Sequence, residues 1–304
     1  MTLADKTVLV TGADRGLGRA LVDEALSRGA TRVYAGTRQP LMHPDARVTP
    51  LALDVTDAEQ IAAAGEAVAS LDVLVNNAGL GGYEDLADRA ALERYLAVNL
   101  FGPYGVTQAL LPRLIESRGA IVNVVSMAAL AALPVSPGYS ISKAATLSMT
   151  QSLRATLAGQ GIHVHAVLAG PVDTDMVREL PIPKASPPSV ARAIFDGIVQ
   201  GHDDIFPDPF SQAFAVGWNG GTVKALEREN AALISAAQML PEVVNRRTTG
   251  RRAGFRPGTG EFTTSGRAPG GSPTRPASSA RARWRAGRTS AVEVPKVLPV
   301  TAAR

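Results

Sequence analysis

Three side chains in the middle of the chain have the types and spacing to move a proton. Tyr139 and Lys143 stand four residues apart, and Ser126 ends an apolar run thirteen residues before Tyr139. If the segment is helical, Tyr139 and Lys143 share one helix face. A nearby ammonium favours the phenolate of a tyrosine, whose ordinary pKa of about 10 otherwise makes it a poor acid or base. Such pairs also arise by chance on solvated helices, so the surrounding elements decide the interpretation.

A glycine-rich turn near the N-terminus could bind a dinucleotide. An apolar, strand-like run over residues 6–11 is followed by Gly12, Gly16 and Gly18, and then by a helical pattern over residues 19–28. Glycines let the backbone turn sharply and approach a pyrophosphate at the positive N-terminus of the helix. A glycine turn without a ligand is the alternative, and the strand and helix on either side favour the dinucleotide interpretation.

The end of the second predicted strand, residues 31–37, bears on the choice of cofactor. In dinucleotide folds an acid at this point suits a free ribose 2′-hydroxyl, and an arginine suits a 2′-phosphate. The sequence has no Asp or Glu between Thr31 and Pro44, while Arg38 follows the strand and Arg15 lies in the glycine turn. A guanidinium can grip a phosphate through two parallel hydrogen bonds. We therefore expect NADP(H) rather than NAD(H), with an ordinary surface role for Arg38 as the alternative.

Strand-like and helix-like segments alternate along the chain. Further strands are predicted over residues 48–53, 72–75, 120–125, 161–168 and 203–208, and helices over 57–69, 88–116, 137–160 and 209–240, with an interruption of the second near Gly102-Pro103. This order predicts an α/β fold, a Rossmann-type doubly wound parallel sheet in a single domain over residues 1–241. Ligands of such sheets enter at the carboxyl ends of the strands, where the small and polar residues 76–79 are expected.

Taken in this order, residues 6 to about 206 resemble the short-chain dehydrogenases/reductases, in an NADP(H)-preferring branch. The motifs that carry the resemblance are Thr11-Gly-x-x-x-Gly-x-Gly18, Asp54, Asn76-Asn-Ala-Gly79, Asn99, Ser126, Tyr139-x-x-x-Lys143 and Gly170-Pro-Val-Asp-Thr174. Each motif is common alone, whereas seven in one order are specific. The chain departs from the family where Ala169-Gly170 replaces the usual Pro-Gly, and where residues 203–208 replace an Asp-Gly-Gly ending.

The resemblance implies a role for each matching residue. Tyr139 would exchange a proton with the substrate oxygen, which Ser126 would hydrogen-bond. Lys143 would lower the pKa of Tyr139 and bind the nicotinamide ribose, and Asn99 would hold a water that links Lys143 to solvent. The expected cofactor-binding residues are Gly12, Asp14, Arg15, Gly16, Leu17, Gly18, Arg38, Asp54, Val55, Asn77, Ala78, Gly79, Tyr139, Lys143, Gly170, Val172 and Thr174.

The expected function is an oxidoreductase that interconverts a carbonyl and an alcohol by hydride transfer with NADP(H) on a hydrophobic small molecule. The apolar residues expected near the substrate, each of which could equally be core, are Leu80, Tyr83, Leu130, Leu133, Val135, Met176 and Leu180. A catalytically idle NADP(H)-binding sensor or scaffold is the alternative, and the complete set of Asn99, Ser126, Tyr139 and Lys143 argues against it. By resemblance we also expect a homodimer or homotetramer.

Composition excludes several other classes of function. The chain has no cysteine, so disulfides and thiolate metal sites are excluded. The pair His163 and His165 lacks further ligands nearby in sequence, so no metal site is expected. No apolar run of about eighteen residues predicts a membrane span, and the N-terminus lacks the pattern of a signal peptide, so we expect a cytoplasmic protein.

The net charge of +4 conceals two unlike regions. Residues 245–304 carry thirteen Lys and Arg but two Asp and Glu, which leaves 18 basic and 25 acidic residues, or −7, for residues 1–244. The acidic body argues against a nucleic-acid-binding protein, although Arg281 to Arg285 could contact nucleic acid or an anionic membrane surface. Residues 242–304, rich in Arg, Pro and Gly, are predicted to be a disordered appendage.

Removal of the chain beyond about Pro241 is expected to leave activity and stability unchanged, because a segment without periodic apolar residues contributes no core. Turnover and thermal unfolding of the shortened and full-length proteins check this expectation. A loss of either property would show that the tail has a function.

Overall fold

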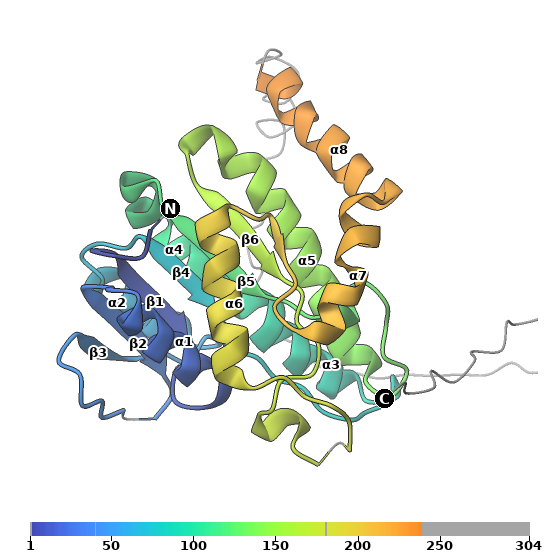
Figure 1. Cartoon of the computed structure of the whole chain (residues 1–304), viewed down its shortest axis with the longest axis horizontal. Helices are drawn as coiled ribbons and strands as arrows, with labels where there is room; N and C mark the ends of the chain where they lie inside the picture. The colour runs from blue at the N-terminus through green and yellow to red at the C-terminus, as the bar shows by residue number, and fades with distance from the viewer. Residues whose placement is uncertain (1, 40, 180, 239–304) are drawn as a thin grey trace, which may run out of the picture. The chain divides into compact units, whose positions relative to one another are not determined.

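A computed structural model describes residues 2–39, 41–179 and 181–238. In this part of the chain one parallel sheet contains seven strands, which run in the spatial order β3-β2-β1-β4-β5-β6-β7 (Figure 1). Their bounds are β1 Thr7–Thr11, β2 Arg32–Thr37, β3 Val48–Ala52, β4 Val73–Asn76, β5 Ala120–Val124, β6 His163–Val167 and β7 Asp204–Ile205. Because β1 pairs with both β2 and β4, the chain reverses its direction of winding there. The predicted doubly wound α/β fold is confirmed.

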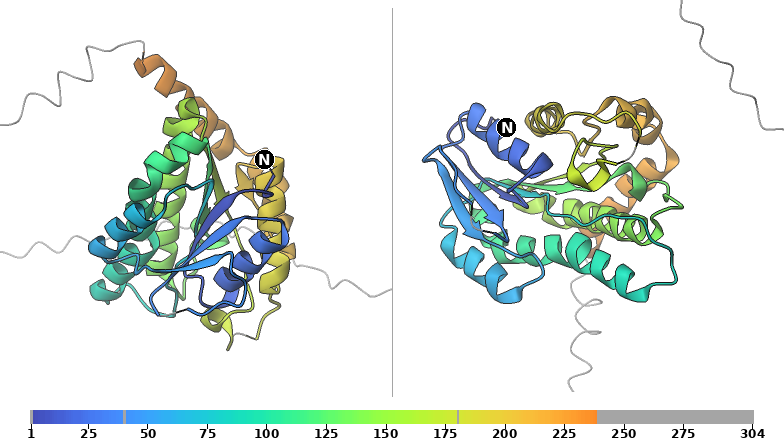
Figure 2. Two further views of the ribbon diagram at one scale, coloured as in Figure 1. Left: turned by 90° about the vertical axis from the view of Figure 1, so that its left-hand side faces the viewer. Right: turned by 90° about the horizontal axis from the view of Figure 1, so that it is seen from below.

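Helices cover both faces of this sheet. Their bounds are α1 Gly16–Ser27, α2 Ala58–Ala67, α3 Arg89–Leu96, α4 Gly102–Ser117, α5 Pro137–Leu157, α6 Pro187–Gln200, α7 Pro209–Asn219 and α8 Thr222–Gln238. Helices α1 and α6 pack together on one face, and α2, α4 and α5 lie on the other (Figure 2). Short 3₁₀ turns occupy η2 Met127–Ala129, η3 Ala158–Gln160 and η4 Asp175–Val177.

The burial of the strands explains their apolar sequences. Every residue of β1 and β4 is buried, as expected for parallel strands with helices on both faces. Strand β3 lies at one edge of the sheet and is partly exposed. It contains Pro50, which an edge strand tolerates because one side of its backbone has no partner strand.

The long helix predicted over residues 88–116 is interrupted near Gly102-Pro103, as expected. A π-helical turn, η1 Ala97–Phe101, separates α3 from α4 directly before these two residues. The Gly102 N–H bonds to the carbonyl of Ala97, five residues back. Pro103 has no N–H to continue the regular ladder, so the irregularity falls in the turn before it.

The last two helices are joined to the sheet by buried charges. The Lys224 ammonium of α8 lies 2.8 Å from carboxylate oxygens of both Asp204 in β7 and Glu227. Arg154 of α5 pairs with the same two acids. Burial alone would raise the pKa of Asp204, but Arg154, Lys224 and the Trp218 indole hold it below its usual value.

Other features of the chain bear on the remaining expectations. Among the described residues no helix is long and apolar enough to cross a membrane. The predicted seventh strand and the helical region after residue 209 are both present. The basic tail predicted over residues 242–304 lies outside the described residues.

The Lys224→Met variant is expected to lose about 3 kcal/mol of unfolding free energy at neutral pH, because the buried Asp204 and the half-buried Glu227 lose a partner. The folded-state pKa of Asp204 is depressed, so its ionic contribution is present above its ordinary pKa of 3.8 and is lost as the pH falls. The difference in unfolding free energy between wild type and Lys224→Met should therefore become smaller below about pH 4.

Urea unfolding across this pH range measures the effect. Lys184→Met, which removes an exposed ammonium that bonds the carbonyl of Arg178, is the matched control and should change stability by less than about 0.5 kcal/mol. Equal effects of the two substitutions would contradict the assignment.

Candidate active site

The predicted site residues meet at the carboxyl edge of the central strands. The Thr11 hydroxyl at the end of β1 accepts hydrogen bonds from the N–H groups of Asn77 and Ala78, both at 3.0 Å. The Asn77 amide donates in turn to the carbonyls of Thr11 and Gly12, at 2.9 and 3.2 Å. These bonds fix the glycine turn against the residues that follow β4.

The glycine turn has the shape that a pyrophosphate requires. Gly12 and Gly16 have φ angles of +64° and +53°, in the left-handed region that favours glycine. A Cβ at Gly18 would lie 1.9 Å from the carbonyl oxygen of Gly12. Arg15 precedes α1 without a side-chain cap, so the first N–H groups of the helix stay available for an anion. The residues present therefore fit a dinucleotide phosphate.

The remaining residues of the turn divide between core and surface. Leu17 is buried in the core on the α1 face of the sheet, which leaves it a packing role in the structure. Arg15 is exposed, with Nη1 3.4 Å from Asp175 and Nε 3.9 Å from Asp14. Arg38 is exposed just after β2. Both arginines are therefore accessible to a charged ligand.

Two predicted cofactor-binding residues follow β3. The Asp54 carboxylate accepts hydrogen bonds from the N–H and the hydroxyl of Thr56, at 2.9 and 2.7 Å, which orders this loop. Val55 is buried, and a Cβ at Gly102 would lie 2.7 Å from its methyl group. The small residue at Gly102 thus lets α4 approach the loop closely.

Lys143 lies beneath Tyr139 on the same face of α5, as the four-residue spacing predicted. Its ammonium is 5.8 Å from the centre of the Tyr139 ring and donates to the carbonyl of Val124 at 2.8 Å. Only 5% of Lys143 is exposed, and burial lowers its pKa to about 8. At neutral pH the ammonium is therefore still mostly charged, although it titrates well below an ordinary lysine.

The pKa of Tyr139 lies above its ordinary value. Burial raises the pKa of its phenol, and a hydrogen bond from the Ser126 side chain lowers it by less. The lowering of this pKa by Lys143 stays a prediction. The ring also contacts Tyr95 of α3 edge-on, with centroids 6.4 Å apart.

Ser126 is held between β5 and β6. Its hydroxyl accepts the N–H of Ala128 at 3.1 Å and so caps the short turn η2. The next residue, Met127, donates its N–H to the carbonyl of Ala169 beyond β6. Ser126 therefore has a fixed backbone on the side of the sheet where Tyr139 lies.

Asn99 sits in the π-helical turn and is 1% exposed. Its side chain accepts the N–H of Leu80 at 2.8 Å and donates to the carbonyl of Leu80 at 2.9 Å. It also donates to the Ser142 hydroxyl. Pro103 cannot donate to the Asn99 carbonyl as a regular helix would, and the Thr146 hydroxyl lies 2.8 Å from it instead. The water-holding role of Asn99 stays a prediction.

A buried polar chain that the sequence did not reveal links these elements. The Asn76 amide of β4 donates to Asn123 of β5 and to Thr107 of α4, at 2.9 and 3.1 Å. The Asn123 amide donates to Thr150 of α5 at 2.9 Å. Asn76 Oδ1 is the buried side-chain atom without a partner among the described residues. The sequence signal for this chain of hydrogen bonds was an asparagine in each of two otherwise apolar strands, Asn76 in β4 and Asn123 in β5.

The segment after β6 closes over the glycine turn. Val172 forms an isolated parallel bridge with Ala185. A Cβ at Gly16 would meet the methyl group of Thr174 at 3.0 Å. Thr174 therefore lies beside the glycine turn, and the cofactor-binding roles of Val172 and Thr174 stay predictions.

The departure at Ala169-Gly170 has a compensating contact that the sequence did not predict. The Gly170 N–H donates to the carboxylate of Asp208 at 2.8 Å. Asp208 is 2% exposed and also caps α7 through Ser211. A Cβ at Gly170 would lie 2.7 Å from both Asp208 and Phe210, so glycine is needed here for space.

Apolar side chains on the surrounding loops remain accessible. Of the predicted substrate-lining set, the exposed members range from 37% for Leu80 to 66% for Tyr83 and include Leu133, Val135 and Met176. A Cβ at Gly81 would lie 2.7 Å from the sulfur of Met176. Leu130 is half-buried, and Leu180 lies outside the described residues.

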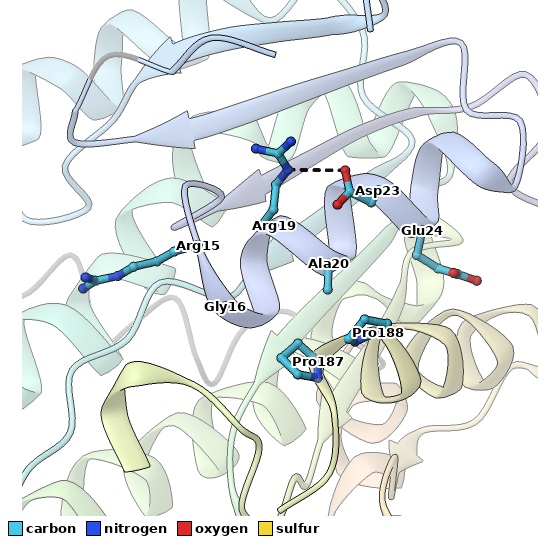
Figure 3. A pocket seen from close by; sticks show the side chains of 8 residues that line it. All are labelled: Arg15, Gly16, Arg19, Ala20, Asp23, Glu24, Pro187 and Pro188. Carbon is cyan, nitrogen blue, oxygen red and sulfur yellow. Dashed lines mark hydrogen bonds and ion pairs between the residues drawn. The ribbon is translucent and has the colours of Figure 1, made fainter. Parts of the chain in front are cut away.

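A groove of about 450 Å³ lies between α1 and α6, beside the glycine turn. Figure 3 shows Arg15 pointing away from it, and Arg19 paired with Asp23. Pro187 and Pro188 form the opposite wall. Its lining includes none of Ser126, Tyr139 or Lys143, and we assign it no chemistry.

The two strand histidines are occupied by packing and hydrogen bonding. The rings of His163 and His165 are nearly parallel, with centroids 6.4 Å apart. The His165 Nδ1 lies 2.6 Å from the carbonyl of His202. Within the described residues no group of three or more His, Asp or Glu side chains is arranged to hold a metal.

Comparison with known proteins identifies the family. A family profile described as short chain dehydrogenase matches residues 6–184. The short chain dehydrogenase pigC of Monascus ruber is 36% identical over 197 residues, which are 58% of this chain and 65% of that protein. The 3-oxoacyl-acyl-carrier-protein reductase FabG of Thermotoga maritima is also 36% identical over 197 residues, covering 60% of this chain and 80% of the relative.

A solved structure extends the similarity beyond the region of the family profile. The short chain dehydrogenase of Burkholderia cenocepacia, determined in complex with NADP, has a TM-score of 0.70 and 37% identity, over 75% of this chain and 98% of the other. This chain spans just under two thirds of the Monascus ruber protein but nearly all of the Burkholderia cenocepacia one. The chain belongs to the short chain dehydrogenases, a family of oxidoreductases that use nicotinamide cofactors.

Proposed function

We propose that this protein interconverts a carbonyl and an alcohol with NADP(H), acting on a hydrophobic small molecule. The observation that carries the proposal is the convergence of Ser126, Tyr139 and Lys143 beside a glycine turn shaped for a dinucleotide phosphate. When bound, the nicotinamide would supply or accept the hydride.

The chain's own residues would manage the proton and the charge. The Tyr139 phenol would give its proton to the substrate oxygen during reduction and take it back during oxidation. Ser126 would hydrogen-bond the same oxygen and stabilise its developing charge. Lys143, with its ammonium 5.8 Å from the centre of the ring, would favour the phenolate as Tyr139 gives up its proton.

The pKa shifts of Tyr139 and Lys143 are consistent with these roles. Burial raises the pKa of Tyr139, so its phenol is protonated at neutral pH, which is the form needed to reduce a carbonyl. The lowered pKa of Lys143 allows the ammonium to exchange its proton near neutral pH. A catalytically idle sensor would not require this matched pair, so we favour the enzyme.

The cofactor and substrate preferences rest on surface chemistry. Arg15 in the glycine turn and Arg38 after β2 are both exposed. The 2′-phosphate of NADP(H) carries about two more negative charges than the 2′-hydroxyl of NAD(H), so these arginines favour NADP(H). The related Burkholderia cenocepacia protein was determined with NADP. The exposed apolar side chains of the loops support a substrate with little charge.

The Tyr139→Phe variant is expected to lose at least about 100-fold in kcat, because the proton donor is removed. NADPH affinity should stay within about twofold of wild type, since the aromatic ring remains. NADPH oxidation over a panel of apolar ketones, aldehydes and quinones, together with fluorescence titration of NADPH, measures both quantities.

Tyr104→Phe is the matched control, because Tyr104 is an exposed tyrosine on α4. It should behave as wild type. Normal turnover by Tyr139→Phe would rule out the assigned proton donor, and the absence of turnover by wild type on the whole panel would favour the sensor alternative.

The Arg38→Ala variant is expected to bind NADPH about tenfold more weakly, because a charge-assisted hydrogen bond to the 2′-phosphate is lost. NADH affinity should change little. Arg32→Ala, which removes an exposed arginine at the start of β2, is the control. Equal weakening of NADPH and NADH binding in Arg38→Ala would show that Arg38 does not select the phosphate.

A further inference from the structure

The N-terminus of α5 is capped by a side chain from another element. The Gly138 N–H donates to Oε1 of Glu84 at 2.7 Å, and Glu84 belongs to the loop between β4 and α3. Ser136, which precedes the helix, makes no side-chain cap bond. Its hydroxyl donates instead to the carbonyl of Gly82 at 2.5 Å. Pro137 has no N–H, so Glu84 bonds the first N–H that the helix presents.

Further contacts hold this loop against the start of α5. The Glu84 N–H donates to the carbonyl of Val135 at 3.4 Å. With the bonds from Ser136 and Gly138, three hydrogen bonds therefore join residues 82–84 to residues 135–138. Tyr139 is the next residue along the helix, so a shift of the loop would reach it directly.

We propose that Glu84 is a positioning residue for Tyr139, which fixes the first turn of α5 through its carboxylate cap. The kinetic part of this inference rests on the proposed function. Glu84 touches neither the reacting atoms nor the cofactor-binding turn in this proposal; it acts through the backbone of Gly138.

The residue types on both sides suit this role. A carboxylate at the N-terminus of a long helix interacts favourably with the helix dipole. A Cβ at Gly138 would lie 3.1 Å from Glu84 Oε1 and 3.2 Å from the Tyr95 ring. The absence of a side chain at Gly138 thus leaves the space in which the carboxylate and the aromatic ring meet the helix.

Tyr139 is surrounded by groups from four parts of the fold. Tyr95 of α3 contacts the ring edge, Lys143 lies beneath it on α5, and Ser126 bonds the phenol. Glu84 approaches from the loop after β4. Burial and, next, the charge of Glu84 raise the pKa of Tyr95, so the neighbouring phenol stays neutral where Tyr139 has to ionise.

The test compares Glu84→Ala with Glu84→Gln in the full-length protein. Glutamine keeps an oxygen that can accept the Gly138 N–H, whereas alanine does not. Asp85→Asn is the matched control, because Asp85 is exposed and accepts a bond from Ala87 within its own loop. We expect kcat to fall about tenfold or more in Glu84→Ala and to stay within about threefold of wild type in Glu84→Gln and Asp85→Asn, with NADPH affinity retained in all three.

A second readout needs no substrate. The phenolate absorbance of each protein, minus that of its Tyr139→Phe counterpart, gives the titration of Tyr139 alone. In Glu84→Ala we expect this titration to shift, because the burial and the Ser126 hydrogen bond that set the pKa of Tyr139 both depend on its position. Glu84→Gln should titrate as wild type.

Two results would overturn the proposal: unchanged kcat and Tyr139 titration in Glu84→Ala, or an equal loss in Glu84→Gln. If Glu84→Ala does not fold, Gly138→Ala perturbs the same contact from the helix side and should reproduce the loss. If wild type turns over no carbonyl substrate, the proposed function fails, and the Tyr139 titration still decides the role of Glu84.

Discussion

The buried hydrogen bonds between β4, β5 and α5 are the constraint on which the site depends. Asn76, Asn123 and Thr150 bond one another inside an apolar interior, where a polar group left without a partner costs about 1–3 kcal/mol. A helix packed by apolar contacts alone could slide or rotate at small cost. The directional bonds remove that freedom, so Lys143 and Tyr139 keep one position relative to the strand ends. Asn99 extends the constraint to the π-helical turn through Ser142.

Much of the fold and the site follows from local sequence. Buried parallel strands produce short apolar runs, and the glycine turn and the pair Tyr139 and Lys143 are recognisable because their members lie within one or two helical turns of each other. Contacts across the chain left no such pattern. Glu84 meets Gly138, 54 residues away, and Asp208 meets Gly170, 38 residues away. The π-helical turn was predictable only in part. Pro103 indicated that the helix is irregular nearby, but it did not give the residues of the turn.

The acid–base properties of the site could not be obtained from spacing alone. A lysine four residues from a tyrosine predicts a lowered phenol pKa, yet desolvation raises the pKa of Tyr139. The same burial lowers the pKa of Lys143. Desolvation thus raises the pKa of the phenol and lowers that of the ammonium. This effect depends on helices and strands that are distant in sequence.

The hydrogen bond between Gly170 and Asp208 ties the turn after β6 to a residue beyond the region that the family profile matches. The family profile stops at residue 184, yet the backbone of Gly170 is held by a residue beyond it, and α7 and α8 are fixed in turn by the charges around Lys224. If two relatives exchanged segments at residue 184, Gly170 and Asp208 would come from different proteins. We therefore expect a transferable unit to include β7 and the two helices that follow, and a chimera to need Gly170 and Asp208 from the same parent.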